Sequence, residues 1–125
     1  MIIGIVLATI ASFVFSAVLY AVPPVSRLIR GSSTPRPGVP VGVQMALVIL
    51  RSLITAALVA GLMVAAGWHG AGTGALLGCA LTALPAVLLL GGVIHEGTPI
   101  RVATIHLLDW IAKLVIIGAL VGAFL

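Results

Sequence analysis

Charged side chains are scarce in this sequence, acidic ones most of all. Only 6% of the 125 residues are charged and 62% are apolar, whereas soluble domains carry roughly 25% charged residues. So few charges cannot cover the surface of a water-soluble chain of this length. The two carboxylates are Glu96 and Asp109. They lie about 20 Å apart if the intervening chain is helical, so catalysis by a carboxylate pair is not expected.

The sequence also lacks the combinations of cysteine, histidine and aromatic residues that mark several other functions. Cys79 is the only cysteine, which excludes an internal disulfide. His69, His95 and His106 are scattered, with no cysteine on a shared face, so we expect no metal site and no cofactor. The net charge is +4, but the basic residues form no patch with interleaved aromatics. Nucleic acid is therefore not an expected partner.

What the chain has instead is four long apolar stretches. A hydrocarbon core about 30 Å thick takes roughly 20 apolar residues in a helix. We therefore expect an all-α, polytopic membrane protein with one domain and four transmembrane helices in an up-down bundle. The first stretch is expected to remain as a span, because no basic segment precedes it and no small-residue cleavage site follows it. The predicted helices cover residues 2–22, 43–66, 74–94 and 102–124.

The arginines predict how this bundle sits in the membrane. With four spans, the loops 23–42 and 95–101 share one side, and the turn 67–73 shares the other side with both termini. The side with both termini carries no Lys or Arg, so the positive-inside rule places the two loops in the cytoplasm and both termini on the non-cytoplasmic side. The same arginines are candidates for contact with anionic lipid headgroups. They are Arg27, Arg30, Arg36 and Arg101.

Small residues recur at every fourth position of the apolar stretches. Lipid tails give helices little reason to associate through the hydrophobic effect, so membrane helices depend on close backbone approach. Residues four apart stack on one helix face, which favours a tightly packed bundle. Pro85 is expected to bend the third helix, and Tyr20 is interpreted as an aromatic anchor at the membrane interface. The candidate packing positions are Gly4, Ala8, Ser12, Gly74, Gly78, Gly118 and Gly122.

Three charged residues fall inside the predicted spans, where each costs roughly 2.5–3.5 kcal/mol on insertion scales. Two of them, Asp109 and Lys113, share one helix face with His106 at i, i+3 and i+7. Asp109 also precedes Lys113 by four residues, the favourable order for a helical ion pair. The third is Arg51, in the second helix, where Gln44 and Thr55 complete a polar stripe.

Matched depth suggests that these two polar faces meet. Arg51 and Asp109 each lie about 10–12 Å from the cytoplasmic start of their helices, so we expect Arg51 to reach Asp109. The cluster then keeps one positive charge. Either Lys113 loses its proton, or it extends toward the interface, or the site takes an anion. The alternative to a transport, binding or proton-relay role is a cluster that only fixes helix register.

Three segments resemble a known family. They are the first-helix segment 11–20, ASFVFSAVLY, which ends in an aromatic before a proline-containing loop, the turn HEGTP at 95–99, and IGAL at 117–120. Together they resemble the DUF1761 family of small bacterial membrane proteins, whose function is uncharacterised. The resemblance implies a four-helix membrane fold and carries no activity; the location we expect is the cell membrane, the inner membrane of a bacterium.

No Ser-His-Asp or Cys-His arrangement stands out in the sequence. The leading hypothesis is therefore a non-enzymatic protein of the lipid bilayer that acts as an oligomeric subunit or as a small-solute permeation unit, which makes it a candidate transporter. Four short helices leave little room for a private pathway, so a homo-oligomer or a larger membrane complex is expected. The alternative is a structural or accessory subunit, and the third hypothesis is a membrane-embedded enzyme.

Overall fold

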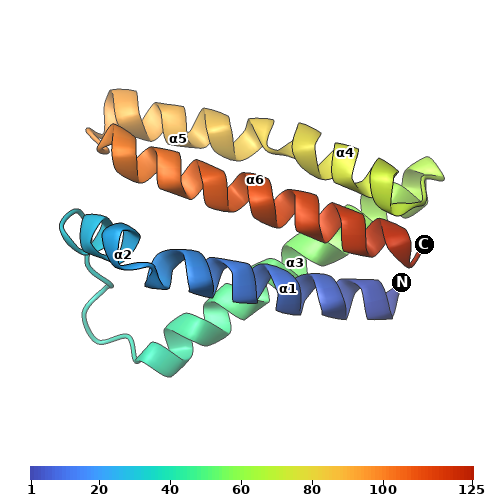
Figure 1. Ribbon diagram of the computed structural model, residues 1–125, viewed down its shortest axis with the longest axis horizontal. Coiled ribbons are helices and arrows are strands. Elements are labelled where there is room, and N and C mark those ends of the chain that lie inside the picture. The colour runs from blue at the N-terminus through green and yellow to red at the C-terminus, as the bar shows by residue number, and fades with distance from the viewer.

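The computed structural model describes all 125 residues, and every regular element in it is a helix. Four helical stretches are long and apolar enough to cross a membrane. The predicted all-helical fold with four spans is therefore confirmed, and the chain is a multi-pass membrane protein. The helices, shown in Figure 1, are α1 (Ile2–Ala21), α2 (Pro23–Arg30), α3 (Val41–Ala66), α4 (Ala71–Leu81), α5 (Ala83–His95) and α6 (Ile100–Ala123).

The long loop predicted at residues 23–42 contains a short helix, α2. Pro23 and Pro24 end α1, as their sequence suggests, but they also begin α2 as its first two residues. Proline suits this position because its fixed φ is already helical and the first-turn N–H has no partner within the helix. Only the segment from Gly31 to Pro40 is therefore free of helix.

The third span is broken in its middle. Residues 71–95 form α4 and α5, with Thr82 between them. Pro85 has no N–H to donate to the Leu81 carbonyl and its ring crowds that oxygen, which accounts for the end of α4 at this point. The Thr82 hydroxyl donates to the Cys79 carbonyl, and the Ala86 amide resumes the helical pattern by donating to Thr82 at 3.1 Å.

The last span, α6, is the centre of the molecule. In Figure 1 α4 and α5 run along one side of it and α1 along the other, and both termini lie at the same end. The Met1 amino group donates to the Phe124 carbonyl at 3.4 Å across that end. The four arginines of the predicted cytoplasmic loops belong to α2, the segment after it and the start of α6, at the opposite end of the bundle.

Helices α4 and α6 approach so closely that their backbones touch. A Cβ atom on Gly74 would overlap the carbonyl of Gly118, and one on Gly118 would overlap the carbonyl of Gly74. Gly78 meets the Leu114 carbonyl in the same way. At the end of this contact the Gly70 amide donates to the Gly122 carbonyl at 2.9 Å. Absence of side chains at these positions is therefore what lets the two helices pack.

The first helix packs against α6 and α3 through the same kind of surface. A Cβ on Gly4 would lie 3.1 Å from Phe124 Cβ and 3.2 Å from the Leu120 carbonyl oxygen. Ala8 and Ser12 are fully buried. The apolar core therefore gathers toward the end that holds the termini. It comprises Ala8, Ala56, Val59, Ala60, Met63, Ile117 and Val121.

Helix α3 joins this core only with its second half. It crosses behind α1 at a steep angle, and its first half leaves the bundle (Figure 1). Its buried residues all follow Arg51, beginning with Ser52, whereas Val41 is 70% exposed. The divergence of α3 from α1 and α6 is what makes room for the site described next.

Candidate functional site

A cavity of about 360 Å³ lies between α1, α3 and α6, on the side where α3 diverges. Its polar lining is Ser16, Tyr20, Arg51, His106, Asp109 and Lys113, and its apolar lining is Phe13, Ala17, Met45, Val48 and Trp110. The three charged residues predicted to lie within the spans therefore all line this cavity. Three helices that are distant in the sequence contribute to it.

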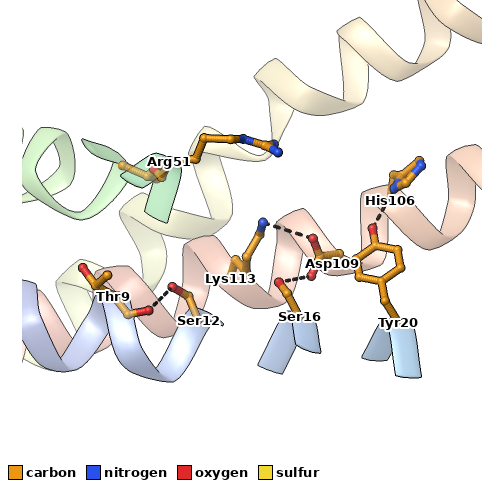
Figure 2. Close-up of polar contacts among 9 residues, drawn as sticks. Thr9, Ser12, Ser16, Tyr20, Arg51, His106, Asp109 and Lys113 are labelled. Carbon is orange, nitrogen blue, oxygen red and sulfur yellow. Dashed lines mark hydrogen bonds and ion pairs between the residues drawn. The ribbon is translucent and has the colours of Figure 1, made fainter. Parts of the chain in front are cut away.

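Asp109 is the most buried charged residue of the cavity. It is 4% exposed, and Lys113 is 8% exposed. Asp109 Oδ2 lies 3.1 Å from Lys113 Nζ, so the ion pair predicted from the i, i+4 spacing forms. The other oxygen, Oδ1, accepts a hydrogen bond of 2.6 Å from the Ser16 hydroxyl (Figure 2). Both carboxylate oxygens are thus occupied by groups of the chain itself.

Arg51 does not pair with Asp109, and the expectation that it would is wrong. Asp109–Lys113 is the only ion pair in the structure. The guanidinium carbon of Arg51 instead lies 5.9 Å from the centre of the Trp110 ring, and Lys113 Nζ lies 4.5 Å from the same ring. Equal depth along two helices brings side chains together only if the helices run side by side, and α3 crosses α6 obliquely.

The first helix contributes a second hydrogen bond to the site. Tyr20 Oη and His106 Nδ1 lie 2.6 Å apart, with the two rings tilted and their centres 5.7 Å apart. Figure 2 shows this pair beside the Ser16–Asp109 contact. Tyr20 is therefore part of the polar cavity, where the sequence suggested only an interfacial anchor. The feature of the sequence that indicates this position is spacing. Tyr20 follows Ser12 and Ser16 at four-residue steps and therefore continues the small-residue face of α1.

The polar stripe proposed for the second span does not act as a unit. Gln44 Nε2 donates to the Val39 carbonyl at 3.1 Å, which closes the start of α3. The Thr55 hydroxyl donates to the Arg51 carbonyl at 2.8 Å, within its own helix. Neither side chain lines the cavity, so Arg51 is the only polar residue that α3 provides there.

The arginines predicted to meet lipid headgroups are all exposed. The side chain of Arg27 folds back along α2, where Nε donates to the Pro23 carbonyl at 3.3 Å. None of the four contributes to the cavity, and their contact with headgroups stays a prediction. The set is Arg27, Arg30, Arg36 and Arg101.

Comparison with known proteins gives a family and no activity. Neither the search of the curated proteins nor the search of the solved structures finds a match. A family model described as a protein of unknown function, DUF1761, matches residues 3–122. The match covers nearly the whole chain, so the resemblance seen in three segments extends over all four spans. The chain belongs to the DUF1761 family.

Proposed function

We propose that this protein is a non-enzymatic permeation unit that binds a small solute in the cavity between α1, α3 and α6. The observation that carries the proposal is the gathering of Arg51, Asp109 and Lys113 around one hollow. Ionisable groups within a span are costly, and they generally mark pathways for solutes or ions. The volume of about 360 Å³ falls within the range of small-molecule sites, about 300–1,000 Å³.

The contacts inside the cavity favour binding over catalysis. A nucleophile needs a general base within hydrogen-bond reach. Ser16 donates to Asp109, however, and His106 is held by Tyr20, so no Ser–His pair forms. Asp109 has no oxygen without a partner, and Cys79 lies outside the cavity. The same side chains hold a fixed arrangement of charge, which is what recognition of a solute needs.

The pathway is proposed to run from the cytoplasm and to be completed by a second copy of the chain. The positive-inside rule supports the orientation, because four arginines lie at the end of the bundle from which α3 diverges. The first half of α3, which includes Val43 and Leu47, leaves the bundle (Figure 1) and is where a second copy is proposed to pack. A partner packed there would close the side of the cavity that a single chain leaves to lipid.

The alternative, an accessory subunit of a larger membrane complex, has its own support. The tight α4–α6 contact needs no solute, and α5 buries none of its residues within the chain, which leaves it a free face for another protein. On this hypothesis the charged cluster only fixes the register of the helices relative to one another. The two hypotheses differ in whether water reaches the cavity.

Thiol labelling in the membrane tests this difference. In a Cys79→Ala background, Ala17→Cys puts a thiol on the cavity wall. Val18→Cys is the matched control, at the same depth but outside the cavity and 62% exposed on the outer surface. A membrane-impermeant reagent is applied from each side of the membrane. We expect Ala17→Cys to react from both sides, because a permeation unit opens to each in turn, and Val18→Cys to stay unlabelled in lipid.

Labelling of Ala17→Cys from the cytoplasm alone contradicts permeation and supports a one-sided binding site. No labelling of Ala17→Cys supports the accessory subunit.

A further inference from the structure

The charges around the cavity do not balance. Asp109 and Lys113 neutralise each other at 3.1 Å, and Arg51 has no carboxylate within ion-pair distance anywhere in the chain. The only other carboxylate, Glu96, follows α5 in the turn between α5 and α6. Arg51 lies ten residues into α3, about 15 Å along its axis. The cavity therefore carries one net positive charge part-way along a span, on a side chain that a single chain leaves exposed.

The guanidinium of Arg51 is held in a way that leaves its donors available. It makes no hydrogen bond through its side chain to the rest of the protein, and its one defined contact is with the Trp110 ring at 5.9 Å. A cation–π contact at this distance holds the guanidinium near the ring and does not use its N–H groups. Those groups form a planar fork that matches the two oxygens of a carboxylate.

The balance of charge selects a monoanion over a dianion. One added negative charge neutralises the cavity as a whole, whereas two would leave an excess next to Asp109, which is itself buried and ionically paired. Like charges in a low-dielectric site repel strongly. Lys113 also lies against Trp110, at 4.5 Å, so a second cation lies near the face where the anion would bind.

Apart from the side chains of Ser16, Tyr20 and His106, the rest of the cavity wall is apolar. This apolar part is formed by Phe13 and Ala17 from α1 and by Met45 and Val48 from α3. A simple inorganic ion would leave this wall without a partner, whereas a short hydrocarbon chain gains roughly 25 cal/mol for each Å² of apolar surface that it buries there. The size of the cavity, about 360 Å³, admits a molecule of this kind.

We propose that the cavity binds small aliphatic monocarboxylates, with the carboxylate on Arg51 and the hydrocarbon part against Phe13, Met45 and Val48. The proposal rests on the proposed function, because it names the class of solute that the same cavity takes. It is tested with purified protein in nanodiscs. Trp68→Phe leaves Trp110 as the only tryptophan, so that its fluorescence reports on the cavity directly.

The titration compares butyrate with butyramide, its uncharged analogue, and with chloride and inorganic phosphate, at neutral pH and constant ionic strength. We expect butyrate alone to change the emission of Trp110 in a saturable manner. Arg51→Gln should weaken butyrate binding at least about tenfold, the scale of a charge-assisted fork, and Arg51→Lys should fall between the two. Arg36→Gln, at an exposed arginine outside the cavity, is the matched control and should bind as the parent does.

Each contrary result is distinguishable. Equal binding of butyramide and butyrate overturns the monocarboxylate proposal and leaves the solute cavity in place. Equal binding of chloride or phosphate shows that the apolar wall selects nothing, and also overturns it. Loss of butyrate binding in nanodiscs of phosphatidylglycerol, but not of phosphatidylcholine, would identify the anion as a lipid headgroup and would overturn it. Unchanged affinity in Arg51→Gln and Arg51→Lys overturns the role of Arg51. If no solute changes the emission of Trp110, the monocarboxylate proposal fails. The labelling of Ala17→Cys then shows whether the proposed function fails with it.

Discussion

The hydroxyl of Ser16 in α1 donates a hydrogen bond of 2.6 Å to the carboxylate of Asp109 in α6. Ninety-three residues separate the two in the chain, yet this contact completes the environment of the only carboxylate within a span. Lys113 binds the other oxygen of Asp109 at 3.1 Å. The first and last transmembrane helices are thus joined at the wall of the charged cavity.

Ser16→Ala should destabilise the protein by about 1–3 kcal/mol, because it leaves one oxygen of a buried carboxylate without a donor. The measurement is unfolding in a mild detergent by increasing amounts of a denaturing one. Ser12→Ala is the matched control on the same face of α1. Ser12 is buried too but bonds only the Thr9 carbonyl of its own helix, so its loss should be smaller. Equal losses in the two variants would show that Asp109 does not depend on Ser16.

Asp109→Asn should destabilise the protein by about 3–5 kcal/mol, because it leaves the buried charge of Lys113 without a partner. The double change Asp109→Asn with Lys113→Gln should recover much of that loss, since it removes both charges together. Unfolding of the two single variants and the double variant gives the coupling energy. A double variant that loses the sum of the single losses would contradict the ion pair.

Gly118→Ala should separate α4 from α6, because its Cβ would overlap the backbone of Gly74. Overpacking of this kind costs about 1–3 kcal/mol, and occasionally more. Gly72→Ala, in α4 with nothing near its Cβ position, is the control and should be neutral or stabilising by up to about 1 kcal/mol. A Gly118→Ala protein as stable as Gly72→Ala would contradict the close backbone contact.

Tyr20→Phe should destabilise the protein by about 0.5–1.5 kcal/mol, the net value of one hydrogen bond. It removes the 2.6 Å contact with His106 Nδ1 and keeps the packing of the two rings. The change should also appear in the NMR shifts of the His106 ring, which the loss of a bond at Nδ1 alters directly. Unaltered His106 shifts in Tyr20→Phe would show that the two side chains do not meet.

Local features of this structure follow from the sequence. The four spans come from apolar length alone, and the Asp109–Lys113 pair comes from the i, i+4 spacing within one helix. The glycines of α4 and α6 were recognisable because a backbone contact requires residues without side chains. Each of these inferences needs only the geometry of a single helix.

Relationships between helices do not follow in the same way. The angle at which α3 crosses α6 results from the packing of Ala56, Val59 and Ala60 against its neighbours, and no spacing in the sequence encodes it. This angle carries Arg51 away from Asp109 and toward Trp110. The sequence does not predict the Ser16–Asp109 contact either, since the partner of Ser16 lies on a helix at the other end of the chain.

The most direct test of the proposed solute site is the stability of Arg51→Gln against that of the parent protein, measured without added solute. Arg51 is proposed to bind a solute and has no ionic partner in the chain. Removing a charge that costs roughly 2.5–3.5 kcal/mol within a span should therefore leave the protein as stable as the parent or more so. A loss of about 3–5 kcal/mol, as expected when one member of a buried ion pair is removed, would make Arg51 a structural partner of Asp109 and would contradict the proposed solute site.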